Sequence, residues 1–240
     1  MISSVHNETI VSLTKLHTKK HRQLSGLALV DGEHLVSEAI KANALNHLYG
    51  LSENAPFEGV AYTQVSEAVM RKLCQTSSLS KMVGVINLPN PGPLGDQVLV
   101  LDGVQDPGNV GTLIRSALAF NFTSIITLPG CADSYSAKVM SASQGAIFKC
   151  SIHELSCEEF KKVSHKYHVL VTDVHHSKTL DEITFKTPSM LVLGSEGAGV
   201  SEFVKSLAHE RVRIKTSEVE SLNVAMAGSI LMYVLNSLKG

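Results

Sequence analysis

The residues best suited to chemistry are Asn109 and Arg115, which lie in the stretch 98–120. A continuous apolar run over residues 98–101 predicts a buried strand, and a turn rich in Asp, Pro, Gly and Asn follows it. Asn109 then suits the N-cap of a helix over residues 109–120, whose apolar positions recur at helical spacing. Arg115 falls off that apolar face, about 140° from its first residue. An amide and a lone guanidinium are therefore expected at a strand-to-helix edge, where open α/β sheets bind ligands.

A second polar stretch also follows an apolar strand. Residues 191–201 lead from this strand into a loop that contains Gly194, Glu196, Gly197 and Gly199. Glycines in such a loop allow a backbone to approach a ligand closely, and their order here matches neither the dinucleotide fingerprint nor the P-loop. Glu196 is interpreted either as a solvated turn residue or as a carboxylate of a site.

The third stretch, residues 211–229, runs from a predicted strand through a polar loop into the last helix. Ser221 is predicted to be the N-cap of that helix, over residues 222–238, and Asn223 lies close behind it. A helix N-terminus is also a favourable position for polar ligand groups. Because the apolar run 222–238 is short for a membrane span and includes Asn and Ser, we expect a buried core helix and no membrane segment.

The elements that position these residues alternate along the chain. Strand and helix patterns succeed one another over residues 94–240, which predicts an α/β fold with a mainly parallel sheet and helices on both faces. Residues 1–93 form a smaller alternating α/β unit. The boundary near residue 93 is placed in the stretch 87–97, which contains three prolines and two glycines.

Composition narrows the classes of function. The net charge of −1 gives no global field that attracts nucleic acid, and the absence of Trp argues against recognition built mainly on stacking, although local patches are not excluded. The four cysteines show no paired spacing and the eleven histidines no ligand spacing, so we expect neither a disulfide framework nor a metal site. Free cysteines and the lack of a signal-peptide pattern favour a reducing, cytoplasmic location.

A basic cluster without an acidic residue occupies residues 15–22. Its cations suit the C-terminal end of a solvated helix, and they equally suit a patch that contacts phosphates. The residues alone leave these two interpretations open for Lys19, Lys20 and Arg22.

Taken together, the three polar stretches resemble the TrmH (SpoU) family of RNA ribose 2′-O-methyltransferases, in the wider SPOUT class. The family motif D-P-x-N-x-G-x-x-x-R-x-A is similar to residues 106–117, G-x-E-G-x-G to residues 194–199, and S-L-N-V-[SA] to residues 221–225. Residues 138–146 resemble a further family segment. One departure is Ile-Lys-Thr at residues 214–216, where many members carry Ile-Pro-Met.

This resemblance implies a fold feature that periodicity would not predict, because knots are essentially absent from proteins. In the family the C-terminal chain threads a loop and forms a deep trefoil knot, whose loops hold S-adenosylmethionine. Members typically act as homodimers, through the SPOUT domain, with active sites near the subunit interface. The cofactor-binding residues implied here are Leu193, Gly194, Gly197, Ile214, Ser221, Leu222 and Asn223.

The resemblance also implies roles for the polar residues. Arg115 would activate the ribose hydroxyl, Asn109 would orient Arg115 or the substrate or simply cap its helix, and Glu196 would pair with a basic group or with the RNA backbone. Residues 1–93 resemble the L30e-like substrate-binding domain of rRNA-modifying members, which favours rRNA over tRNA. That similarity also favours phosphate binding by Lys19, Lys20 and Arg22.

Two alternative functions are retained. One is a tRNA ribose methyltransferase of the same family, and the other is a non-catalytic RNA-binding protein that kept the fold. The intact polar residues of the three motifs speak against lost activity. A failure to bind S-adenosylmethionine would favour the binding protein.

Overall fold

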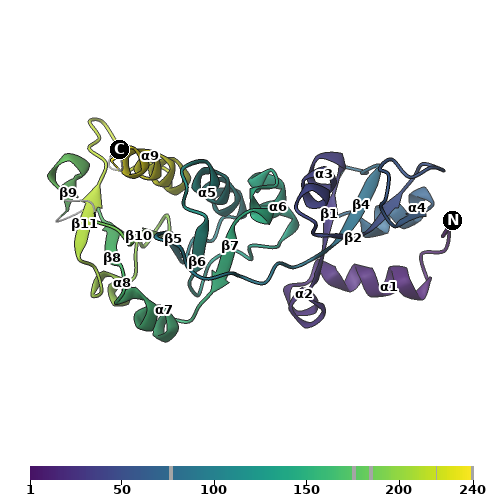
Figure 1. Cartoon of the computed structure of the whole chain (residues 1–240), viewed down its shortest axis with the longest axis horizontal. Coiled ribbons are helices and arrows are strands. Elements are labelled where there is room, and N and C mark those ends of the chain that lie inside the picture. Colours follow the sequence, from purple (N-terminus) through teal and green to yellow (C-terminus); the bar gives the residue numbers. More distant parts are fainter. Residues whose placement is uncertain (76–77, 175–176, 184–185, 220, 239–240) are drawn as a thin grey trace.

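The computed structural model describes residues 1–75, 78–174, 177–183, 186–219 and 221–238. Two sheets, each with its own helices, follow one another along the chain and along the longest axis of the molecule (Figure 1). The first sheet ends at Asn87 and the second begins at Gln97. Residues 88–96 join the two units without helix or strand.

The N-terminal unit is a four-stranded sheet in the order β1-β4-β2-β3. The β1–β4 and β2–β4 pairs are antiparallel, and β2 pairs in parallel with β3. Its strands are β1 (Leu27–Asp31), β2 (Leu45–Gly50), β3 (Tyr62–Gln64) and β4 (Met82–Asn87). Its helices are α1 (Glu8–Thr14), η1 (Lys15–His17), α2 (Lys19–Ser25), α3 (Glu33–Lys41) and α4 (Glu67–Leu73).

The C-terminal unit is a seven-stranded sheet in the order β7-β6-β5-β10-β8-β11-β9, and all of its strand pairs are parallel. Its strands are β5 (Gln97–Asp102), β6 (Ser124–Thr127), β7 (Ser151–Glu154), β8 (His168–Thr172), β9 (Lys178–Thr179), β10 (Ser189–Gly194) and β11 (Glu210–Arg213). Its helices are α5 (Pro107–Ala119), α6 (Ala137–Ser143), η2 (Ala146–Phe148), α7 (Cys157–Ser164), η3 (Leu180–Glu182), α8 (Glu202–Lys205) and α9 (Val224–Ser237).

Helices cover both faces of this sheet, which confirms the predicted α/β architecture. The side chains of β5 alternate between the faces, as strand geometry requires. Leu99 and Leu101 pack into the core formed with α5, α6 and α9, whereas Val98 and Val100 pack with Phe160 of α7 and with α8. Figure 1 shows α5 and α9 together on one side of the sheet and α7 and α8 on the other.

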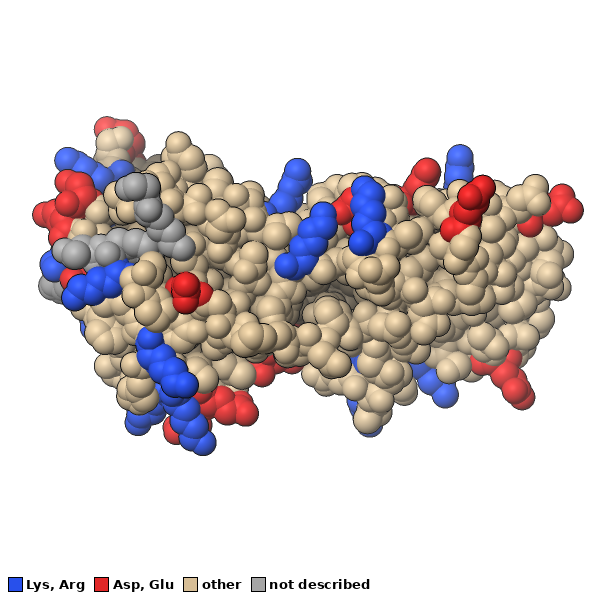
Figure 2. All heavy atoms as spheres, viewed as in Figure 1, with Lys and Arg blue, Asp and Glu red and all other residues tan. Residues whose placement is uncertain are grey.

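The last helix is α9, and it is buried on one side only. Leu231, Met232 and Leu235 are buried, as expected of a core helix, whereas Met226 and Tyr233 are 58% and 59% exposed. No helix in the described part of the chain is both long and apolar enough to cross a membrane. On the face shown in Figure 2, acidic and basic side chains are interspersed.

Candidate functional site

The carboxyl ends of β5 and β10 meet at one edge of the sheet. The two strands are parallel neighbours, with Gly194 in register with Asp102. Asp102 is 8% exposed, and its Oδ2 accepts a hydrogen bond of 2.7 Å from the backbone N–H of Ser201. The loops that follow the two strands are therefore tied together at the edge where ligands bind in parallel sheets.

Helix α5 begins two residues earlier than its sequence pattern predicts. Asp106, not Asn109, is the N-cap, and its Oδ1 accepts a 2.8 Å hydrogen bond from the backbone N–H of Asn109. Pro107 follows at the first helical position, where its missing N–H costs nothing. Asn109 thus lies in the first turn of the helix, and its side-chain amide is available for other contacts.

The Asn109 side chain connects the three polar stretches. Its Nδ2 donates a 2.6 Å hydrogen bond to Oε1 of Glu196, 87 positions further along the chain. Its Oδ1 accepts a 3.1 Å hydrogen bond from Nδ2 of Asn223, 114 positions away. The structure therefore brings together one residue from each predicted motif.

Asn223, and not Ser221, is the N-cap of α9, so the predicted capping role of Ser221 is wrong. The Oδ1 of Asn223 accepts hydrogen bonds from the backbone N–H groups of Ala225 and Met226 at 2.9 and 3.3 Å. Its Nδ2 is used for the contact with Asn109. An amide can do both because its oxygen accepts while its nitrogen donates. Ser221 is an exposed loop residue.

Helix α9 lies close beside α5 because Gly228 lacks a side chain. A Cβ at Gly228 would lie 2.5 Å from Cδ2 of Leu113 and 2.4 Å from Cδ1 of Leu193. The hydroxyl oxygens of Ser116 and Ser229 are 2.7 Å apart between the same two helices. This close packing places the start of α9 next to the start of α5.

Arg115 lies apart from the hydrogen-bonded trio of Asn109, Glu196 and Asn223. Its side chain is exposed, and it makes no ion pair or side-chain hydrogen bond with any residue that the structure describes. It lies six residues after Asn109, or about 9 Å along the axis at the usual helical rise. The guanidinium is thus free to contact a ligand.

The loop after β10 is a tight turn that requires glycine. The Cβ of any other residue at 194 would lie 2.0 Å from the backbone carbon of Gly199. Ser195 and Gly199 exchange two backbone hydrogen bonds of 3.0 Å, which close the turn. By contrast, a Cβ at Gly197 would meet no heavy atom within 4 Å. The backbone at Gly197 is therefore open to an approaching group.

The predicted cofactor-binding residues form a set that fits a cofactor with both polar and apolar parts. Gly197 presents open backbone, and the apolar residues Ile214 and Leu222 are half-buried, so each keeps some exposed surface. Leu193 is only 1% exposed and packs under α9, so its side chain belongs to the core and is not accessible to a cofactor. Within the described residues no group of three or more His, Cys, Asp and Glu could hold a metal ion.

The three basic residues of the N-terminal unit are placed differently from one another. Lys20 is exposed on α2, and Lys19, half-exposed, pairs with Glu154 at 2.9 Å. Arg22 is 4% exposed and its guanidinium pairs with Asp133 of the C-terminal unit. This buried position does not fit the predicted phosphate-binding role of Arg22.

The sequence analysis assigned no role to two carboxylates that shape the site, Asp102 and Asp106, although Asp106 is the first residue of the motif at residues 106–117. The capping role of Asp106 could have been predicted, because an Asp followed by Pro at the predicted start of a helix is typical of an N-cap and first helical position. Nothing in the sequence pattern points to Asp102, whose role depends on the backbone of Ser201.

The chain is similar to known proteins in both of its units. The model of the SpoU rRNA Methylase family matches residues 96–233, and that of the MRM3-like substrate binding domain matches residues 7–84. The chain is 30% identical to the 23S rRNA (guanosine(2553)-2'-O)-methyltransferase RlmP of Bacillus subtilis, over 98% of each protein.

Solved structures give the same comparison in three dimensions. An AdoMet-bound rRNA methyltransferase from Sinorhizobium meliloti has a TM-score of 0.86 and 25% identity, over 99% of this chain and 97% of that one. A TrmH/SpoU tRNA modifying enzyme from A. aeolicus shares the fold over 60% of this chain and 75% of its own, with a TM-score of 0.52 and 23% identity.

Proposed function

Because the chain belongs to the SpoU rRNA methylase family, we propose that it transfers the methyl group of S-adenosylmethionine to a ribose 2′-hydroxyl of RNA. The observation that carries this proposal is the position of Asn109. Its amide joins Glu196 and Asn223 at one edge of the sheet, next to the open turn at Gly197. The free guanidinium of Arg115 lies on the same helix.

Ribosomal RNA is the proposed substrate class. The relative from Bacillus subtilis is named for 23S rRNA and aligns over 98% of each chain, whereas the tRNA modifying enzyme matches 60% of this chain. The match of residues 7–84 to a substrate binding domain supports an RNA-binding role for the N-terminal unit. Lys19 and Lys20 on α2 are its proposed phosphate contacts, because ammonium groups at a surface favour the RNA backbone.

The cofactor is assigned to the loops after β10 and β11. S-adenosylmethionine, when bound, supplies a methyl group on a positively charged sulfur. The open backbone at Gly197 would accept its polar groups, and Ile214 and Leu222 would contact its apolar surface. Gly194 and Ser221 are proposed to shape these two loops.

Arg115 is the proposed catalytic residue. A guanidinium donates five N–H groups and has no acceptor, so it does not take a proton as a carboxylate or imidazole would. We assign it a position beside the ribose and its phosphate, where its charge stabilises the alkoxide that develops on the 2′-oxygen. The proton then leaves to a phosphate oxygen or to water. In-line alignment of the oxygen, the methyl group and the sulfur supplies much of the rate.

Asn109 and Glu196 are proposed to hold the geometry of this site. The carboxylate of Glu196 accepts from Asn109, and Asn109 in turn accepts from Asn223. These bonds fix the start of α5 relative to the loop after β10 and to α9. Asn109 would thereby orient the helix that carries Arg115 against the cofactor loops.

A homodimer is proposed through the exposed apolar face of α9. Met226, Ile230 and Tyr233 recur at helical spacing along this face and are 58%, 39% and 59% exposed. A second copy of the chain is the proposed occupant, since exposed apolar stripes of this kind are typical of subunit contacts. This face adjoins α5, so a dimer would place the two sites near the interface.

The deep trefoil knot and a cytoplasmic location belong to the same proposal. The knot is proposed from the match of residues 96–233 to the SpoU rRNA Methylase family model. The location follows from the ribosomal RNA on which the bacterial relative is named to act.

The proposal is tested by supplying labelled S-adenosylmethionine with total rRNA and, separately, with tRNA. We expect label in the rRNA alone. Label in tRNA alone would show that the protein is the alternative tRNA ribose methyltransferase. Calorimetry with S-adenosylmethionine tests the cofactor directly, and no binding together with no label would favour the non-catalytic RNA-binding protein.

A further inference from the structure

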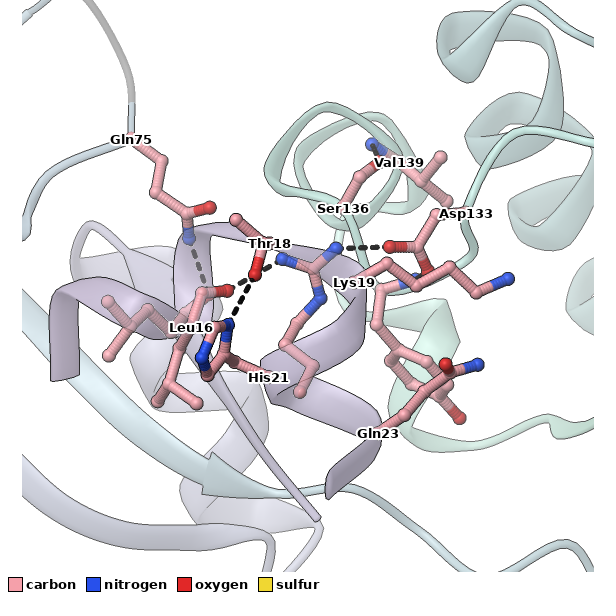
Figure 3. Close-up of polar contacts among 12 residues, drawn as sticks. Leu16, Thr18, Lys19, His21, Gln23, Gln75, Asp133, Ser136 and Val139 are labelled. Carbon is pink, nitrogen blue, oxygen red and sulfur yellow. Dashed lines mark hydrogen bonds and ion pairs between the residues drawn. The ribbon is translucent and has the colours of Figure 1, made fainter. Parts of the chain in front are cut away.

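Arg22 on α2 is a buried cation whose acidic partner lies in the other unit. Its Nη1 donates a 2.6 Å hydrogen bond to the backbone oxygen of Leu16, and its Nη2 pairs with Oδ2 of Asp133 (Figure 3). The side chains of Arg22 and Asp133 are only 5% and 16% exposed. Because an unpaired charge is costly to bury, separating the two units here would require Arg22 to find water or another anion.

Asp133 is itself held firmly in the loop between β6 and α6. Its Oδ1 accepts a 3.1 Å hydrogen bond from the backbone N–H of Tyr135, and its carbonyl oxygen accepts one of 3.0 Å from the N–H of Ser136. Ser136 is the N-cap of α6. The ion pair therefore connects α2 to a loop with fixed geometry.

The same loop is fastened to the strand that leads into the candidate site. The backbone N–H of Ala132 donates a 2.9 Å hydrogen bond to the carbonyl of Val104, and Sγ of Cys131 donates one of 3.2 Å to the carbonyl of Leu101. Residues 101–104 run directly into the turn that starts α5. The ion pair therefore joins α2 to a loop that is itself fixed to the segment leading into α5.

A cavity of about 290 Å³ lies where the two units meet. It is lined by Lys19 from α2 and by two segments at the carboxyl ends of β6 and β7, residues 127–132 and 154–156. Its volume is close to the lower end of the roughly 300–1,000 Å³ of small-molecule sites. One wall of the cavity therefore belongs to α2, and part of the opposite wall belongs to the loop that contains Asp133.

We propose that the Arg22–Asp133 ion pair is a positioning device for the substrate RNA. It fixes α2, with Lys19, against the loop after β6, and so sets the walls of the cavity along which the RNA passes from the N-terminal unit to the methyl-transfer site. This inference rests on the proposed function. Among the residues that the structure describes, the other ion pairs between the units are Lys19–Glu154 and Glu38–Lys149. Both involve exposed lysines and contribute little to fixing the geometry.

The test compares full-length variants in rRNA methylation. Arg22→Met and Asp133→Asn break the pair, and the exchange Arg22→Asp with Asp133→Arg restores opposite charges. We expect the single changes to raise KM for RNA about tenfold or more, with kcat and the Kd for S-adenosylmethionine nearly unchanged, because the pair positions the RNA-binding unit and not the reacting groups. The exchange should recover part of the loss. Arg71→Met, which breaks an exposed pair with Glu67 on α4, is the matched control and should change none of these values.

A KM for RNA at the wild-type level in both single variants would overturn the inference. So would a parallel loss of RNA and S-adenosylmethionine binding with a lowered melting temperature, since that pattern indicates a purely structural pair. If Arg22→Met does not fold, Arg22→Lys replaces it and should give an intermediate KM. If the wild-type protein methylates no RNA, the proposed function fails. Filter binding then tests the inference separately: the single variants should bind rRNA more weakly than the wild type, and the exchange variant should recover part of the affinity.

Discussion

Asn223 donates a hydrogen bond to Asn109 across 114 positions of sequence, and the same side chain caps the start of α9. Its oxygen binds the first N–H groups of α9 while its nitrogen binds α5. The start of each helix is thereby fixed relative to the other. The geometry of the candidate site depends on this contact, because Glu196 reaches the pair only through Asn109.

Replacing Asn109 by Ala removes both hydrogen bonds of the trio. We expect kcat/KM for RNA methylation to fall about a hundredfold, because a catalytic helix displaced by about 1 Å loses that much rate. Thermal stability should change little, since the bonds are exposed. Asn236→Ala is the matched control, because it removes a 3.1 Å bond from Asn121, which follows the C-terminal end of α5, to α9. Equal effects of the two changes would show that the position of the bond is irrelevant.

Arg115→Lys keeps the positive charge and loses the planar fork. We expect a fall in kcat of at least about a hundredfold, because an ammonium cannot contact the ribose oxygen and its phosphate in the same geometry. Arg71→Lys on the remote helix α4 serves as control. An Arg115→Lys enzyme that turned over RNA at the wild-type rate would remove Arg115 from the mechanism.

Glu196→Gln separates hydrogen bonding from charge. A glutamine oxygen can still accept from Nδ2 of Asn109, so we expect activity within about tenfold of wild type, and a much larger loss for Glu196→Ala. Single-turnover rates of the two variants measure the difference. Equal inactivity of both would mean that the negative charge itself is required.

Two glycines of the loop after β10 should respond in opposite ways to Ala. Gly194→Ala places a Cβ 2.0 Å from the backbone of Gly199, so we expect a loss of more than about 3 kcal/mol in the free energy of unfolding. Gly197→Ala meets no neighbouring atom and should leave stability within about 0.5 kcal/mol. Calorimetry should nevertheless show weaker binding of S-adenosylmethionine by Gly197→Ala. Unchanged binding would place the cofactor elsewhere.

Tyr233→Glu puts a charge on the exposed face of α9. We expect this variant to be monomeric in analytical ultracentrifugation while the wild type is a dimer, because a carboxylate would have to be desolvated in the interface. Val11→Glu, a change at an exposed apolar residue of α1, is the control and should remain dimeric. A wild-type monomer, or a dimeric Tyr233→Glu, would contradict the proposed interface.

The sequence predicted much of the architecture because periodicity reports burial. The alternation of strands and helices was enough to indicate a parallel sheet covered on both faces, and the apolar run in α9 indicated a core helix. Helix starts were less well predicted, since Asp106 and Asn109, or Ser221 and Asn223, are all good capping residues. Only the three-dimensional position of each side chain decides which one accepts the first N–H groups.

The motifs identified the polar residues, but their mutual contacts could not be predicted. Asn109 meets Asn223 because Gly228 allows α9 to approach α5, and this approach is a property of tertiary packing. Arg22 is the clearest departure. Its basic neighbours suggested a surface patch, yet its partner Asp133 lies 111 positions away in the other unit, where no local pattern could reveal it.

The most direct measurement maps the methyl group within RNA. Labelled S-adenosylmethionine is reacted with rRNA in the presence of the wild-type protein or Arg115→Lys, and the RNA is hydrolysed with alkali. A 2′-O-methyl group blocks cleavage of the adjacent phosphodiester, so we expect the label in a single alkali-resistant dinucleotide with the wild type and nearly none with the variant. Label that appears in alkali-sensitive mononucleotides would place the methyl group on a base and contradict the account.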